Sequence, residues 1–130
     1  ELHRRSMAPC PFPLTEVGLL PTDRSKLHQA IQDRFMEMLD LGLIEEVAIL
    51  KSNSENHKGL PAFRAVGYRQ IWSYLDGEVD YDTMIETGIA ATRQLAKRQY
   101  TWLRSWQDLV IQSRPNLAEV LKILDDDPRL

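Results

Sequence analysis

Apolar residues recur at every third or fourth position over most of the chain, a spacing that places them on one face of an α-helix. This pattern predicts five helices, at about 23–41, 43–51, 65–75, 81–106 and 117–124. Two short apolar runs, at 15–20 and 109–112, are bounded by proline or polar residues and predict β-strands. The chain is therefore expected to be mainly helical.

Capping residues indicate the limits of two of these helices. The side chain of Thr22 or Asp23 can accept hydrogen bonds from the free amides at the start of the first helix, and Gly42 can take the left-handed turn that ends it. Asp80 or Asp82 lies near the start of the longest helix, where the helix dipole favours a negative charge.

The two predicted strands lie far apart in the sequence, with helices between them. This order favours a parallel pair at the edge of an α/β sheet whose other strands are missing from this chain. A small helical domain with irregular tails is the alternative. We expect three segments within a single domain or part of one: a linker and edge strand at 1–21, a helical region at 22–106, and a strand and helix at 107–130.

The composition is that of an ordinary soluble globular protein, with 130 residues, 43% hydrophobic and 27% charged. No apolar run approaches the roughly 20 residues that cross a bilayer, so we expect no membrane association. Cys10 is the only cysteine, which rules out an internal disulfide and fits a reducing cytoplasm. The three histidines are scattered without metal-ligand spacing, so no metal site is expected.

The net charge of −3 argues against a nucleic-acid partner, but the charges are unevenly spread. Residues 57–75 and 87–107 together contain 7 of the 16 basic residues and none of the 19 acidic ones. An even spread would put about six acidic residues there. The basic charge is therefore segregated into two parts of the chain.

Arg34 is a candidate ligand-binding residue because of its place in the first predicted helix. It follows Leu27 and Ile31 and precedes Met38 at helical spacing, which predicts that its side chain points inward. A buried guanidinium needs a carboxylate or a phosphate as its partner. A structural ion pair and a polyphosphate ligand both satisfy this requirement, so both interpretations stay open.

Two segments without acidic residues are candidates for contact with nucleic acid. The first, 64–70, has two arginines, a glycine and a tyrosine that could meet phosphates and a base, or could form an ordinary helix start with solvated arginines. On the longest helix, Arg93, Lys97, Thr101 and Arg104 form a basic stripe roughly opposite the apolar face. A nucleic-acid contact, a membrane surface and a solvated face all fit this stripe, and the membrane is disfavoured because no dense basic cluster is present.

Three ordered blocks of the sequence resemble tRNA dimethylallyltransferases. One is Leu-Pro-Ala-Phe-Arg-Ala-Val-Gly-Tyr-Arg-Gln at 60–70, and another is Ala-Thr-Arg-Gln-Leu-Ala-Lys-Arg-Gln at 91–99, followed by Thr-Trp-Leu-Arg. The third runs from Leu27-His28 to Met38-Leu39 and includes Arg34. The similarity covers about 17–106. No G-x-x-x-x-G-K-[ST] phosphate loop occurs, so about half of such an enzyme is absent.

The resemblance implies transfer of a dimethylallyl group from dimethylallyl pyrophosphate to N6 of the adenine next to the tRNA anticodon. It implies that the two strands belong to the parallel sheet of an α/β phosphate-loop fold, and that the complete enzyme uses Mg²⁺ with no ligands in this chain. The family's general base lies outside this chain. We expect a cytoplasmic, monomeric enzyme, and an inactive fragment where this chain stands alone.

The resemblance also assigns roles to residues. Arg34 corresponds to the arginine that contacts pyrophosphate, and the resemblance therefore implies that Arg34 is a catalytic residue. The residues that correspond to the tRNA-binding segments are Arg64, Ala65, Val66, Gly67, Tyr68 and Arg69, with Lys97, Arg98, Gln99, Tyr100, Thr101, Trp102, Leu103 and Arg104. The alternative function is a noncatalytic helical module whose basic face binds RNA or a protein partner.

Overall fold

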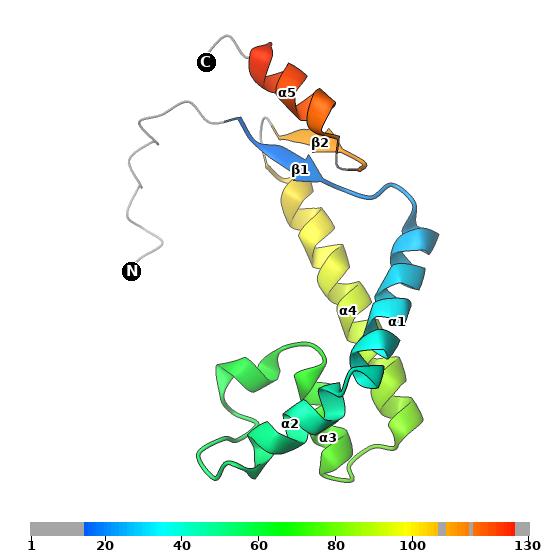
Figure 1. Ribbon diagram of the computed structural model, residues 1–130, viewed down its shortest axis with the longest axis vertical. Helices are drawn as coiled ribbons and strands as arrows, with labels where there is room; N and C mark the ends of the chain where they lie inside the picture. The colour runs from blue at the N-terminus through cyan, green and yellow to red at the C-terminus, as the bar shows by residue number, and fades with distance from the viewer. Residues whose placement is uncertain (1–14, 107–108, 115, 127–130) are drawn as a thin grey trace. The chain divides into compact units, whose positions relative to one another are not determined.

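The computed structural model describes residues 15–106, 109–114 and 116–126 (Figure 1). Most of these residues are helical, and two short strands are present, as the sequence predicts. The elements are β1 (Val17–Leu19), α1 (Arg24–Asp40), α2 (Leu43–Ser52), the 3-10 helix η2 (Pro61–Arg64), α3 (Tyr68–Leu75), α4 (Tyr81–Arg104), β2 (Val110–Gln112) and α5 (Leu117–Asp125). In the part of the chain described, no helix combines the length and apolarity that crossing a bilayer requires.

The chain divides into two compact units. We call the residues from Asp23 to Thr101 the helical unit, since they contain α1, α2, η2, α3 and most of α4. The described residues before Asp23 and after Thr101 form the strand unit.

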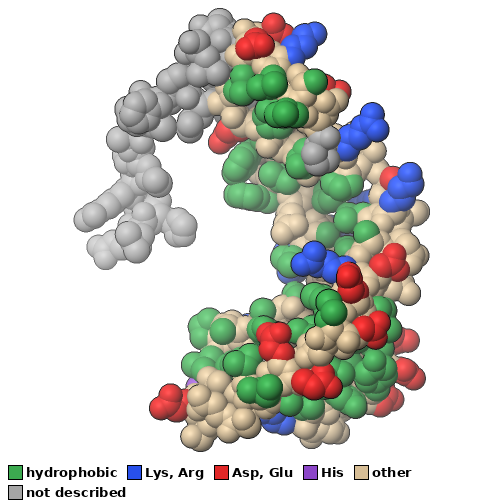
Figure 2. Space-filling model, in the orientation of Figure 1, with side chains coloured by type: hydrophobic (Ala, Val, Ile, Leu, Met, Phe, Trp, Pro, Cys, Tyr) green, Lys and Arg blue, Asp and Glu red, His purple; other side chains and the backbone are tan. Residues whose placement is uncertain are grey.

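The strand unit is built on a parallel pair of strands. Val17 pairs with Val110 and Leu19 with Gln112, and the Leu20 amide donates to the Gln112 carbonyl at 2.8 Å. Parallel pairing of strands so distant in sequence confirms the predicted arrangement, which needs a long crossover connection. The next helix, α5, leaves a row of leucines exposed, and hydrophobic side chains of this unit reach the surface in Figure 2.

The first helix of the helical unit has the limits that its capping residues predict. The Asp23 carboxylate accepts hydrogen bonds from the Ser25 amide at 2.9 Å and the Lys26 amide at 3.1 Å, which satisfies two free donors of α1. After α1, Gly42 has a φ of +96°, a left-handed conformation that glycine takes without strain. The chain can therefore pass from α1 into α2 through a short turn.

The core of the helical unit combines residues from all its helices. Its buried members are Ile31, Phe35, Leu39, Val47, Phe63, Ile71, Trp72, Met84 and Ile89. Phe35 is 2% exposed, and its ring lies directly over Gly88 of α4. A Cβ on Gly88 would come within 2.4 Å of Phe35 Cζ, so the two helices approach where α4 has no side chain.

The start of α3 differs from the sequence prediction. The helix was expected from Ala65, but Pro61–Arg64 forms a separate 3-10 turn and α3 begins at Tyr68. Gly67 separates the two elements with a φ of +97° and a ψ of −65°, which cannot continue a right-handed helix. Phe63 is buried within the 3-10 turn, so tertiary packing and one glycine together delay the helix.

We predict that Gly88→Ala destabilises the protein by about 1–3 kcal/mol, because the added methyl group must displace the Phe35 ring from a packed core. Urea denaturation of the variant gives this difference directly. A Gly88→Ala/Phe35→Leu double variant should be more stable than the sum of the two single effects, since a smaller side chain makes room for the methyl group. Additive effects would contradict the packing described.

Candidate functional site

Arg34 is exposed, contrary to the prediction that it points inward. The buried face of α1 consists of Ile31, Phe35 and Leu39, which follow one another at intervals of four residues. Arg34 precedes Phe35 and therefore lies at the border of this face. Among the described residues, no carboxylate forms an ion pair with its guanidinium. The structure thus removes the structural ion pair as an account of Arg34 within these residues.

Arg93 has the environment that was expected of Arg34. It was predicted to lie on the basic stripe opposite the core, but its side chain is half-buried, and its Nε is buried without a hydrogen-bond partner in the described structure. The reason is its spacing: Arg93 follows buried Ile89 by four residues and precedes half-buried Ala96 by three. Lys97 and Thr101, the next members of the predicted stripe, are exposed.

Packing of Phe63 fixes the first predicted tRNA-binding segment, residues 64–69. The Phe63 ring lies 4.8 Å from the Trp72 ring, between centroids, and is buried. Because Phe63 faces the core, the next residue, Arg64, faces outward, and Ala65 is exposed as well. Arg69 is also exposed, in the first turn of α3, so both arginines of the segment are open to solvent.

Gly67 gives this segment its shape. Its amide donates to Oε1 of Gln70 at 3.0 Å, and Gln70 is itself buried, at 7% exposure. The positive φ of Gly67 is rarely adopted by residues with a side chain, so the turn between Arg64 and Arg69 requires glycine at this position. The turn is therefore held by both backbone conformation and a buried hydrogen bond.

Tyr68 is held by α2 instead of standing free on the surface. Its hydroxyl donates to Oε1 of Glu46, and its half-buried ring packs against the core. The hydrogen bond to Glu46 raises the pKa of the Tyr68 hydroxyl, and burial adds to the effect. Tyr68 thus connects the 64–69 segment to α2, and Glu46 is a contributor that the sequence pattern did not single out.

The second predicted segment, residues 97–104, is helical throughout and belongs to α4. Lys97, Arg98 and Gln99 are exposed, whereas Tyr100 and Leu103 are half-buried, and Val66 of the first segment is half-buried too. The Thr101 hydroxyl donates to the Lys97 carbonyl at 3.1 Å and so serves the helix backbone.

Trp102 is 58% exposed and makes an edge contact with Trp106, at 4.7 Å between ring centroids. Both rings belong to the strand unit, as does Arg104. An exposed tryptophan offers a flat apolar face on which an unpaired base can stack. Trp102 is therefore a candidate stacking residue of the strand unit.

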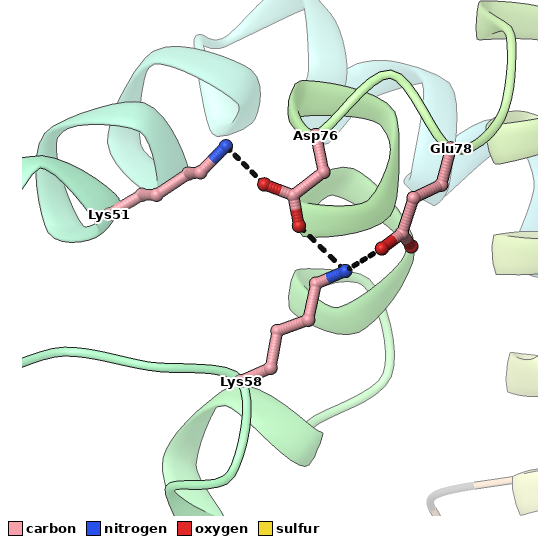
Figure 3. A network of polar contacts seen from close by, with 4 residues as sticks. All are labelled: Lys51, Lys58, Asp76 and Glu78. Carbon is pink, nitrogen blue, oxygen red and sulfur yellow. Dashed lines mark hydrogen bonds and ion pairs between the residues drawn. The ribbon is translucent and has the colours of Figure 1, made fainter.

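Lys58 belongs to an ion-pair network and does not add free positive charge (Figure 3). Its Nζ lies 2.6 Å from Oδ2 of Asp76 and 2.6 Å from Oε1 of Glu78, while Lys51 Nζ lies 2.6 Å from Oδ1 of Asp76. The sequence window 57–75 is free of acid, but Asp76 and Glu78 lie just beyond it and fold back onto Lys58. Arg64 and Arg69 are the exposed arginines of that window.

The network shifts the pKa of each partner in the direction expected for ion pairs. Hydrogen bonds from Lys51 and Lys58 lower the pKa of Asp76, and one from Lys58 lowers that of Glu78. Hydrogen bonds to Asp76 and Glu78 raise the pKa of Lys58. Among the described residues, no three His, Cys, Asp or Glu side chains are grouped so that they could hold a metal ion.

Comparisons with known proteins show which family this chain belongs to. The sequence model of the IPP transferase family matches residues 1–106. The chain belongs to the IPP transferase family. It is similar in structure to the full-length tRNA isopentenylpyrophosphate transferase of Bacillus halodurans, with 28% identity and a TM-score of 0.78 over 90% of this chain and 39% of that one.

The same fold occurs in the tRNA delta(2)-isopentenylpyrophosphate transferase of Staphylococcus epidermidis, with 24% identity and a TM-score of 0.66 over 84% of this chain and 34% of that one. The chain therefore spans well under half the length of the solved transferases it matches. These matches confirm the family resemblance and the fold class predicted from the sequence.

We predict that the Lys51–Asp76–Lys58–Glu78 network makes stability depend on pH at both ends of the range. The contribution of Asp76 and Glu78 to the free energy of unfolding is complete above their pKa in the unfolded chain, about 4. It declines as the pH falls from there through their lowered pKa values in the folded protein. The Lys58 contribution is complete below about 10.5 and declines as pH rises through its raised pKa.

The measurement is thermal unfolding from pH 2.5 to alkaline pH above 10.5 for the parent and Asp76→Asn. The variant should show a shallower acid limb and a weaker response to salt, because the substitution removes two ion pairs. Glu55→Gln, which removes an exposed loop carboxylate outside the network, is the matched control. Identical acid limbs for Asp76→Asn and the parent would show that the network does not contribute.

Proposed function

We propose that this chain is the tRNA-contacting and pyrophosphate-contacting part of a tRNA dimethylallyltransferase. The complete enzyme would move a dimethylallyl group from dimethylallyl pyrophosphate to N6 of the adenine next to the tRNA anticodon. The observation that carries the proposal is the family match over residues 1–106, together with three exposed arginines of those residues, Arg34, Arg64 and Arg69, that form no ion pair in the described structure.

The reaction requires stabilisation of the pyrophosphate leaving group and access to the adenine of the tRNA. N6 of adenine attacks C1 of the dimethylallyl group, the C1–O bond breaks with its electron pair leaving on pyrophosphate, and N6 gives up a proton to a base outside this chain. Because pyrophosphate gains negative charge as it leaves, a guanidinium beside it lowers the barrier. The exposed position of Arg34 and its lack of a protein partner among the described residues support this role.

The two exposed segments support contact with the anticodon stem-loop. Arg64 and Arg69 flank the Gly67 turn, and Lys97 and Arg98 lie on α4, so each segment can place cations against phosphates. Access to N6 requires the adenine to leave its stack, and phosphate contacts on both sides hold the strand while it does so. Trp102 is an exposed aromatic residue on which a neighbouring base can stack.

The described residues do not form a magnesium site, so we assign no step of this chain to the metal. We propose that the complete enzyme draws Mg²⁺ ligands and its phosphate loop from residues outside this chain, which is inactive without them. A cytoplasmic setting suits tRNA as the substrate, and a monomeric state suits a full-length enzyme with one complete site in each copy.

We predict that Arg34→Ala in the full-length enzyme containing this sequence lowers the single-turnover prenylation rate by about 10- to 100-fold, which is the effect expected for a charge-assisted hydrogen bond. Affinity for an anticodon stem-loop should stay within a factor of two or three. Arg24→Gln, at an exposed arginine in the first turn of α1, is the control. Equal rates for Arg34→Ala and the parent would exclude the pyrophosphate role.

We predict that Arg64→Glu, Lys97→Glu and Arg98→Glu each weaken stem-loop binding and reduce its salt dependence. Neutralisation of one fewer phosphate should reduce the slope of log K against log salt by roughly 0.7–0.9. Fluorescence anisotropy of a labelled stem-loop at several salt concentrations measures both effects. Lys122→Glu, on the exposed surface of α5, is the matched charge reversal; if it changes the slope as much as the others, the segments have no special role.

A further inference from the structure

Arg93 is a half-buried arginine that has no role in the proposed function so far. It lies on the core-facing side of α4, four residues after Ile89, which is 9% exposed. The side chain is half-buried, and its Nε is inaccessible to solvent and has no hydrogen-bond partner among the described residues. A buried guanidinium donor without an acceptor is unfavourable, so the position calls for an acceptor that the described residues do not provide.

Five carboxylates of the helical unit have other partners, and no ion pair of the described residues involves Arg93. Asp23 and Asp80 cap the starts of α1 and α4, and Asp76 and Glu78 hold Lys58. Glu46 accepts the hydrogen bond from Tyr68. The sequence around Arg93 contains no acidic residue from Thr87 through Trp106, so α4 itself offers no carboxylate along that stretch.

The charges beside Arg93 indicate what kind of acceptor would fit. Lys97 follows at four residues, a spacing at which like charges on one helix repel, and Arg98 adds a third cation. A single carboxylate would leave most of this positive charge unbalanced. A phosphate group carries more charge and more acceptor oxygens, and its geometry suits the planar donors of a guanidinium.

We propose that Arg93 binds a phosphate oxyanion of the substrates, as a binding residue separate from Arg34 and from the exposed tRNA-contacting segments. The inference rests on the proposed function for the identity of the substrates, which carry phosphate on both the prenyl donor and the tRNA backbone. The half-buried side chain leaves part of the guanidinium reachable from solvent, while the buried Nε restricts its orientation.

The experiment compares Arg93→Gln and Arg93→Lys with the parent in the full-length enzyme, with Arg24→Gln as an exposed arginine control. Inorganic pyrophosphate binding is measured by calorimetry, stem-loop binding by anisotropy over a range of salt, and Tm without ligand by thermal unfolding. We expect Arg93→Gln to weaken binding of one of the two ligands by about tenfold or more. Arg93→Lys should weaken that binding less, because lysine keeps the charge but not the planar set of donors of arginine.

The two measurements separate the phosphate sources. Weaker pyrophosphate binding with an unchanged stem-loop salt slope assigns Arg93 to the prenyl donor, and the reverse assigns it to the tRNA backbone. In either case the Tm without ligand should not fall, because Arg93→Gln removes a charged donor that lacks an acceptor in the ligand-free protein.

Two results would overturn the inference. One is parent-like binding of both ligands by Arg93→Gln. The other is a fall in its ligand-free Tm beyond that of Arg24→Gln, which would reveal a structural acceptor elsewhere in the longer protein. Pyrophosphate binding that depends on Arg93 would stand even if no prenyl transfer were detected, so failure of the proposed function is a separate outcome.

Discussion

Helix α1 meets α4 through the contact of one aromatic ring with a residue that has no side chain, and the rest of the helical unit depends on this contact. Phe35 lies over Gly88, and the same ring is 4.0 Å from the place where a Cβ of Gly67 would stand. The ring thus approaches both α4 and the turn before α3. Protein interiors are closely packed, so the Phe35 ring limits where its neighbours can lie. These neighbours are α4, the 64–69 segment and, next to Phe35 in the chain, Arg34.

The two glycines in this arrangement serve different physical needs. Gly88 has ordinary helical surroundings and is required for space, because a methyl group there would collide with Phe35. Gly67 has space for a methyl group but a backbone conformation that disfavours one. The first need concerns how closely helices approach, and the second concerns how the chain presents Arg64 and Arg69. Packing and the candidate binding surface therefore meet at the same ring.

Periodicity predicted the helices and strands well, because each element is encoded by neighbours in sequence. It failed for the choice of face on α1, since Leu27, Ile31, Arg34 and Met38 are as regular a set as Ile31, Phe35 and Leu39. The face of α1 that is buried depends on Gly88, 53 residues after Phe35, because a residue without a side chain leaves room for the Phe35 ring. Neither the pairing of Lys58 with Asp76 nor that of Tyr68 with Glu46 has a local sequence signal, because both join residues from different elements.

A protein with a net charge of −3 can present a surface for a polyanion if its acidic residues are engaged elsewhere. Here Asp23 and Asp80 cap helices, Asp76 and Glu78 neutralise lysines, and Glu46 holds Tyr68. None of these carboxylates forms an ion pair with Arg34, Arg64, Arg69 or Arg93 in the described structure. The field near those arginines is set by local charge and distance, since charges more than about 10 Å away are screened at ordinary ionic strength. The net charge of the chain is therefore not a measure of the field at these arginines.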